Sequence, residues 1–290
     1  MAPRQVFDGD CSRLFTTEEL EAAVGTAVTP VPAADIFDNQ GTENQRFGGL
    51  RCDWVAPEYA VYVGVLVLPA AAVSYTEDHA CDIALESGHA GCALEAITNG
   101  IRISGVVTRS DRDIGLAATA QAALLAVFAE HAVGVNVAPV PLPAAGAWSF
   151  PVDCPAVVAA ADFSGVPGLG ASSTGDHGGG SDAFYPRAAL ELWSDVGPPH
   201  CFITGESVYL YFDAYGGGRW KEAEVAAGAG TAPIAVDGLD AVYSVPLGDG
   251  TFRVNVFDGP NWLQFTVNFT TNAPAIAQTL VASLDLTAAT

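Results

Sequence analysis

Apolar residues in the first half of the chain follow strand-like or helix-like spacings that predict a series of short elements. A helix is predicted with Thr16 or Thr17 as its N-cap, Glu18, Glu19 and Glu21 in its first turns, and Gly25 just past its end. The alternating apolar residues after Asn99-Gly100 predict a strand that follows a two-residue hairpin turn. The other predicted elements are a strand over Tyr59–Leu68, a helix over Glu77–Glu86 and an Ala-rich helix over Leu116–His131.

The second half repeats this order of elements. Each half opens with an aromatic residue, a short turn and a cysteine, at Phe7 and Cys11 and then at Phe150 and Cys154. Such recurrence in register predicts two tandem copies of one module that contains both helices and strands. The matching elements are a weak helix over Pro155–Asp162, a strand over Ser207–Phe212, a helix over Arg219–Ala227, a turn at Asp249-Gly250, strands around Val254 and Phe265, and a helix over Ala273–Leu284.

A proline-rich segment separates the two halves. Residues 138–147 carry Pro139, Pro141 and Pro143 at alternate positions and no charged residue, which is typical of a semi-rigid extended linker. We therefore expect a first module over residues 1–137, the linker over 138–147, and a second module over 148–290.

Acidic residues are in excess in both halves. The chain has 33 acidic and 11 basic residues, with 18 and 7 before Pro143 and 15 and 4 after it. Because binding to nucleic acid or anionic lipid needs clustered Lys and Arg, we exclude nucleic acid as a partner. The charge favours solubility, and it leaves a cationic partner as the alternative.

The sequence predicts an exported protein without a membrane span. The longest apolar run, residues 60–73, is too short to cross a bilayer and contains Pro69. Met1 leads directly into a polar segment, so we interpret it as an expression start placed on a mature chain. Abundant Ala, Val and Gly with a single lysine, Lys221, are typical of a GC-rich, actinobacterial genome.

Six cysteines predict three disulfide bonds. The repeat pairs Cys11 with Cys52 and Cys154 with Cys201, and each bridge would stabilise the fold by about 4 kcal/mol. The remaining cysteines, Cys81 and Cys92, would then join the helix at 77–86 to the strand that precedes Asn99-Gly100. Bridges are typical of a secreted or extracytoplasmic protein.

Two histidines close to the third cysteine pair leave a metal alternative open. His79, Cys81, His89 and Cys92 offer two imidazoles and two thiols, the donor set of a tetrahedral zinc site. An oxidising compartment removes thiolates, and His-x-Cys is a cramped chelate. We therefore favour the disulfide.

The first half carries a motif that resembles a known group of domains. Cys11, a short helix ending at Gly25, and Cys52-Asp53-Trp54 opening a strand resemble small secreted or lipid-anchored actinobacterial domains. These are similar to the sensor domains of mycobacterial receptor kinases and related lipoproteins. The resemblance implies an α+β fold in which each of two repeats has an antiparallel sheet packed against helices, with a lipid anchor on the precursor as an open alternative. The second half departs from it, since Cys201 has no following tryptophan.

A Gly- and Asp-rich loop in the second half contains the most suggestive polar residues. His177 and the three glycines after it are similar to an esterase oxyanion loop, but Ser207 lacks the surrounding glycines of a nucleophile elbow. Asp176, His177 and Asp182 are the candidate metal ligands, with calcium as the one cofactor left open. A surface loop without a ligand is the favoured interpretation. Asp8-Gly9-Asp10 is likewise interpreted as a solvated turn.

Aromatic residues supply the candidate ligand site. Tyr209, Tyr211, Tyr215 and Trp220 lie close together in sequence, beside a glycine-rich turn. Core packing is the favoured explanation, and an aromatic-lined groove is the functional alternative.

These patterns assemble no nucleophile, base or metal set. We therefore expect a secreted or cell-surface, non-enzymatic binding, sensing or accessory protein, whose ligand is a protein, a small molecule or an envelope component. The alternatives are an extracellular hydrolase whose polar groups converge only in the fold, and a structural or assembly subunit of an envelope complex. The site is expected between the modules or along the loop Gly170–Phe184.

Overall fold

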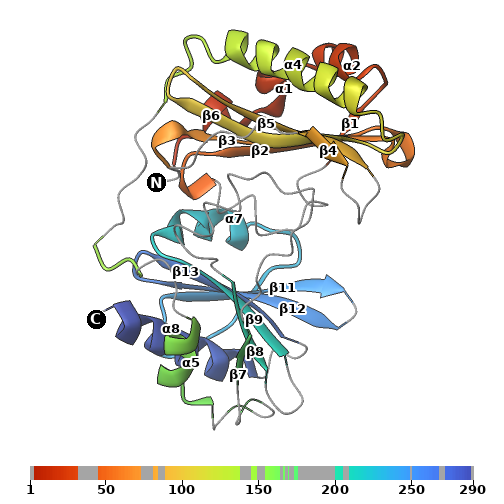
Figure 1. The fold of residues 1–290 in the computed structure, drawn as a ribbon. Coiled ribbons are helices and arrows are strands. Elements are labelled where there is room, and N and C mark those ends of the chain that lie inside the picture. The colour runs from red at the N-terminus through yellow and green to blue at the C-terminus, as the bar shows by residue number, and fades with distance from the viewer. Residues whose placement is uncertain are drawn as a thin grey trace. The chain divides into compact units, whose positions relative to one another are not determined.

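The computed structural model describes most of the chain and divides it into two compact units near residue 142. Each unit contains an antiparallel sheet and helices, so the expected α+β class is confirmed (Figure 1). The described residues are 3–31, 45–72, 81–83, 89–137, 145–148, 154–163, 166, 169, 173–175, 200–204, 209–248, 250–267 and 272–288.

The first unit is a six-stranded antiparallel sheet with helices on one face (Figure 1). Its strand order is β1-β2-β3-β6-β5-β4. The strands are β1 (Thr29–Pro30), β2 (Leu50–Val55), β3 (Val61–Pro69), β4 (Cys81–Ile83), β5 (Ala90–Thr98) and β6 (Ile101–Arg109). The helices are α1 (Cys11–Leu14), α2 (Thr17–Val24) and α4 (Ile114–His131), with 3-10 turns η1 (Val6–Gly9), η2 (Pro57–Tyr59) and η3 (Ala70–Ala72).

Local signals explain why the helices of this unit begin and end where they do. Thr16 and Glu19 form a reciprocal capping box at the start of α2, and Gly25 closes the helix in the left-handed conformation at φ 78°. Asp113 caps α4, since its Oδ1 accepts a hydrogen bond from the Leu116 N–H at 2.9 Å. The predicted start and end of the first helix are confirmed.

The core of the first unit lies between the sheet and the helices. Alternate residues of β3 and β6, such as Val65 and Ile103, are fully buried together with Leu124 and Phe128 of α4. By length and composition alone, α4 could also span a membrane. The sequence predicts this helix over residues 116–131 but not as a membrane span, because polar residues interrupt its apolar ones. Since core helices of soluble proteins pass the same test, α4 is weak evidence for a membrane span.

The second unit has a seven-stranded antiparallel sheet in the order β10-β11-β12-β13-β9-β8-β7. Helices α5 and α8 pack on one face, whereas η5 packs against β13 near the segment α7 on the other (Figure 1). The strands are β7 (Ser173–Gly175), β8 (His200–Thr204), β9 (Tyr209–Tyr215), β10 (Ala232–Pro233), β11 (Ala241–Gly248), β12 (Thr251–Asp258) and β13 (Asn261–Val267). The helices are α5 (Cys154–Ala160), η5 (Gly218–Lys221), α7 (Glu222–Ala226) and α8 (Ala273–Ala288).

Three disulfides join the predicted partners. Cys11 is bonded to Cys52, linking α1 to β2, and the Cys154–Cys201 bond links α5 to β8, with Cα–Cα distances of 5.7 and 5.5 Å. The third bond joins Cys81 to Cys92 across a Cα–Cα distance of 4.1 Å. Because both sulfurs are used in this bond, the zinc alternative is wrong.

The predicted helix over Glu77–Glu86 is wrong where the structure describes it. Residues 81–83 form β4, in which Cys81 lies opposite Cys92 and Ile83 opposite Ala90. The third disulfide therefore links two adjacent strands rather than a helix and a strand. Three residues are too few to show a helical or strand period, and pairing with β5 decides their conformation.

Candidate functional site

The aromatic residues predicted as a ligand groove occupy different environments. Tyr215 is buried and stacks on Trp262 with a ring-centroid distance of 4.5 Å, in a small cluster that also contains Phe257. Tyr211 is 47% exposed on β9, and Trp220 lies on η5 with the Lys221 ammonium 5.3 Å from its ring. The side chain of Tyr209 lies outside the described residues. Trp262 was not among the aromatic residues predicted for this site, although it lies in the apolar stretch that forms β13.

Asp176, His177 and Asp182 lie outside the described residues, as does the loop Gly170–Phe184 apart from 173–175. Among the residues that are described, no group of three His, Cys, Asp or Glu side chains could hold a metal ion.

A polar cluster of the first unit is satisfied within itself. The Arg51 guanidinium makes two hydrogen bonds to the carboxylate of Asp53, at 2.9 and 3.1 Å, and the Tyr62 hydroxyl donates to the same carboxylate. Burial and the charge of Asp53 raise the pKa of Tyr62, so its hydroxyl stays protonated. Gly64 makes room for this contact, because a Cβ there would lie 2.2 Å from the Tyr62 hydroxyl oxygen. We assign this cluster a structural role.

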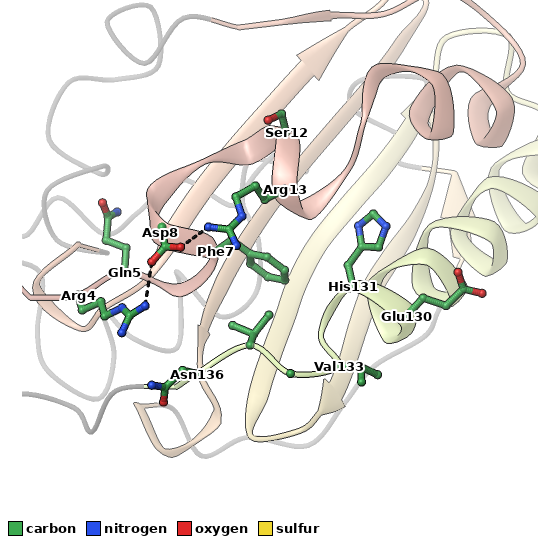
Figure 2. Close-up of a pocket in the computed structure, with 12 residues that line it drawn as sticks. Arg4, Gln5, Phe7, Asp8, Ser12, Arg13, Glu130, His131, Val133 and Asn136 are labelled. Carbon is green, nitrogen blue, oxygen red and sulfur yellow. Dashed lines mark hydrogen bonds and ion pairs between the residues drawn. The ribbon is translucent and has the colours of Figure 1, made fainter.

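A pocket of about 520 Å³ lies at one end of the first unit (Figure 2). Residues of η1 and α1 form one side of it, and the end of α4 with the segment after it forms the other. Its lining combines two arginines, two carboxylates, an imidazole and two amides with an apolar part. The lining residues are Arg4, Gln5, Phe7, Asp8, Ser12, Arg13, Glu130, His131, Val133, Gly134, Val135 and Asn136.

A strained turn builds the wall of this pocket. Phe7 and Asp8 have φ values of 51° and 53°, in the left-handed region that costs non-glycine residues about 1 kcal/mol or more each. Non-local contacts hold the turn: the Val6 N–H donates to the Gly48 carbonyl at 2.9 Å, and the side chain of Phe7 is only 4% exposed. Such strain persists only where the surrounding structure determines it, and it concentrates at functional sites.

The turn presents Asp8 between two arginines (Figure 2). Asp8 accepts hydrogen bonds from Arg4 at 3.2 Å and from Arg13. The hydrogen bonds from Arg4 and Arg13 lower the pKa of Asp8, although partial desolvation opposes them. Arg4 and Arg13 are more than half exposed, and each donates from one nitrogen to this shared carboxylate. Asp8 was predicted to lie in a solvated turn, and only the spacing of Arg4 and Arg13 around it in the sequence indicated these partners.

His131 closes the pocket at the end of α4. Its Nδ1 lies 2.8 Å from the Leu14 carbonyl oxygen and its Nε2 lies 3.1 Å from a carboxylate oxygen of Glu19. The other oxygen of Glu19 accepts hydrogen bonds from Thr16 in the capping box. Partial burial acts to raise the pKa of Glu19, but the bonds from Thr16 and the charge of His131 outweigh it, so that pKa is lowered. His131 therefore ties the end of α4 to α2.

Two carboxylates near Arg219 in the second unit have pKa values that are shifted in opposite directions. Burial and the charges of Asp285 and Asp240 raise the pKa of Asp258. A hydrogen bond from Arg219, together with its charge and the Gly259 N–H, lowers the pKa of Asp240. Ionised Asp258 therefore destabilises the fold, whereas ionised Asp240 stabilises it.

Asp258→Asn is expected to raise the melting temperature at pH 7. The folded state binds the Asp258 proton more tightly than the unfolded state, so the cost of ionisation is present at neutral pH and disappears as pH falls through the raised pKa. The gain, about 0.5 kcal/mol or less, should therefore vanish below about pH 3.5. Thermal melts from pH 3 to pH 7 measure it. Asp240→Asn is the control with the opposite expected sign at pH 7, and a destabilised Asp258→Asn protein at that pH would contradict the prediction.

Comparisons with protein-family models, curated proteins and solved structures found no match to this chain.

Proposed function

We propose that this chain is a secreted or cell-surface, non-enzymatic binding and sensing protein whose pocket recognises a small zwitterionic ligand. Three disulfides are consistent with an oxidising, extracellular location. The observation that carries the proposal is the pair of arginines that share Asp8, in a chain where acidic residues outnumber basic ones three to one.

The arginines have donors left for an anionic group. A guanidinium has five N–H donors, and Arg4 and Arg13 each use one nitrogen on Asp8. Other arginines are matched with carboxylates of their own: Arg109 binds Asp111, and Arg219 binds both Glu222 and Asp240. A ligand carboxylate could therefore accept charge-assisted hydrogen bonds from both exposed guanidinium groups of the pocket.

The opposite side of the pocket favours a positive group. Glu130 lines the cavity on the side away from Arg4 (Figure 2). Its carboxylate would repel a second anion and attract an ammonium group. The apolar part, with Val133 and Val135, suits an apolar side chain of the ligand. A free amino acid or a short peptide has this distribution of charge.

The polar groups of the pocket support recognition over hydrolysis. The Ser12 hydroxyl donates to Asp10 at 2.7 Å, and both ring nitrogens of His131 are directed at Leu14 and Glu19. A serine nucleophile needs a hydrogen bond to a base with an available nitrogen. Here the serine and the histidine are bonded to other groups.

Isothermal titration with free amino acids tests the proposed ligand class. We expect binding that weakens for the methyl esters, which lack the carboxylate, and for the N-acetyl derivatives, which lack the ammonium group. Arg4→Gln/Arg13→Gln should weaken binding by about 10- to 100-fold, since charge-assisted hydrogen bonds contribute about 1.5–3 kcal/mol. Glu130→Gln should reduce only the preference for free amino acids over their N-acetyl derivatives, because Glu130 is the proposed partner of the ammonium group.

Arg112→Gln is the matched control, because Arg112 precedes the start of α4, away from the pocket lining. It should bind as the unchanged protein does. Absence of binding at millimolar amino acid, or equal affinity in the double arginine variant, would refute the proposal.

We also propose that the two units are tandem copies of one module. The order β1-β2-β3-β6-β5-β4 corresponds element by element to β7-β8-β9-β13-β12-β11, with β10 as an addition. In both units a disulfide joins the first helical segment to the second strand of this order, and a long helix follows the last strand. These correspondences support a duplication, and an experimental structure in which the matched strands fail to superpose would oppose it.

The pairing registers refine the match between the copies. Starting from Cys52 and Cys201, the strand partners make Cys92 equivalent to Phe252 and Cys81 equivalent to Pro246. The same strand order matches the Asn99-Gly100 turn to residues 259–260 rather than to Asp249-Gly250. The third disulfide thus occupies a position where the other copy has an apolar cross-strand pair.

A further inference from the structure

A second strained turn lies between β2 and β3. Glu58 and Tyr59 have φ values of 56° and 55°, a conformation that is a clear outlier for a bulky residue. Backbone hydrogen bonds from Tyr59 N to the Ala56 carbonyl and from Ala60 N to the Pro57 carbonyl, both 3.1 Å, close the turn.

Burial does not offset the strain at Tyr59. The side chain of Tyr59 is 69% exposed, whereas Phe7, which has the same backbone conformation, is 4% exposed. Among the described residues, the Tyr59 hydroxyl has no hydrogen-bond partner. The strained turn therefore places the Tyr59 side chain in solvent. There the side chain contributes little to the stability of the fold but is available to contact a partner.

An exposed loop lies beside this turn. The Ser110 N–H donates to the Ala60 carbonyl at 3.0 Å, which brings the connection between β6 and α4 next to residues 57–60. Arg112 in this connection is also left-handed, at φ 61°. Ile114 and Leu116 at the start of α4 are exposed apolar residues. We name the surface of residues 57–60 and 110–116, all exposed, the Tyr59 edge.

Acidic side chains accompany the apolar ones on the Tyr59 edge. Glu58, Asp111 and Asp113 are acidic, Arg112 is the cation on the edge itself, and Arg109 beside the edge pairs with Asp111, which leaves the edge with a net negative charge. The net charge of −22 adds a field that attracts a cationic partner. Tyrosine is enriched among the residues that dominate binding energy at interfaces, and surrounding charges select the partner.

We propose that the Tyr59 edge is a docking surface for a protein segment that presents apolar residues flanked by lysines or arginines. The edge is separate from the amino-acid pocket. The Tyr59 edge lies at the end of β2 and the start of α4. The pocket lies at the other end of both elements, near the residues that precede β2 and at the end of α4. The two sites can therefore be tested independently.

Fluorescence anisotropy with two synthetic peptides tests the proposal. Both peptides contain the same Leu-Trp-Leu centre, flanked by lysines in one and by glutamates in the other. The full-length chain should bind the lysine peptide and not the glutamate peptide. Tyr59→Ala should weaken binding at least tenfold, and Glu58→Lys should reduce the preference for the lysine peptide.

Two further variants separate recognition from folding. Tyr59→Gly should weaken peptide binding as Tyr59→Ala does, yet it should raise the melting temperature because glycine adopts positive φ without strain. Tyr211→Ala, which removes a partly exposed tyrosine of the second unit, should leave peptide affinity unchanged. Absence of binding to the lysine peptide, equal affinity for both peptides, or unchanged affinity in Tyr59→Ala would overturn the proposal.

Discussion

Replacing both Cys11 and Cys52 by alanine is expected to lower the free energy of unfolding by about 4 kcal/mol. The two residues are 41 positions apart, so the bond removes much conformational freedom from the unfolded chain. The alanines leave no buried hydroxyl at Cys52, which is almost completely inaccessible to solvent. Urea unfolding followed by circular dichroism measures the change.

The Cys81–Cys92 bond is the internal control for this result. Its partners are only 11 positions apart, so the same chain-entropy argument assigns it about 3 kcal/mol. The double alanine variant of Cys81 and Cys92 should therefore unfold at a higher urea concentration than that of Cys11 and Cys52. The reverse order would show that strain or residual structure in the unfolded chain, rather than loop length, determines the contribution of these bonds.

Elements with local signals were predictable from the sequence. Thr16 and Gly25 mark the first helix through groups within a few residues of the helix ends, and the structure has the cap and the left-handed closure there. Asn99-Gly100 forms the predicted two-residue turn because both residues tolerate positive φ, at 51° and 77°. The pairings Cys11–Cys52 and Cys154–Cys201 were predicted from a recurring order of elements in the sequence, and Cys81–Cys92 from the two cysteines that remained.

Features that depend on distant partners were not predictable. Residues 81–83 become a strand because β5 pairs with them, and nothing within three residues shows this. Tyr215 was grouped with its neighbours in sequence, yet its stacking partner Trp262 lies on another strand. Sheet pairing places these residues together across long stretches of chain.

The pocket is a non-local feature of the same kind. Arg4, Asp8 and Arg13 come together only because residues 7 and 8 are left-handed, and a bond from Val6 to Gly48 helps to hold that turn. An aspartate before glycine is a common turn signal, so the sequence indicated a turn but not its strain. In the sequence, only the spacing of Arg4 and Arg13 around Asp8 indicated that the three side chains could interact.

Gly105→Ala is expected to destabilise the first unit by about 3 kcal/mol or more. Gly105 lies opposite Val65 in the pairing of β6 with β3 at the centre of the sheet. A Cβ at this position would lie 2.4 Å from the Gly64 carbonyl oxygen and 2.9 Å from the Val65 Cα. Because these are backbone atoms, rotation of a side chain cannot relieve the overlap, and the strands would have to separate.

Gly91→Ala in the neighbouring strand β5 is the matched control for this prediction. Its Cβ would meet first a methyl group of Thr108 at 3.3 Å, so a small side-chain movement can accommodate it. We expect a change in the free energy of unfolding of about 1 kcal/mol or less. Urea unfolding of both variants measures the difference. The added methyl group is the same at both positions, and only the atoms around it differ. Equal stability of the two variants would therefore contradict the close backbone approach at Gly105.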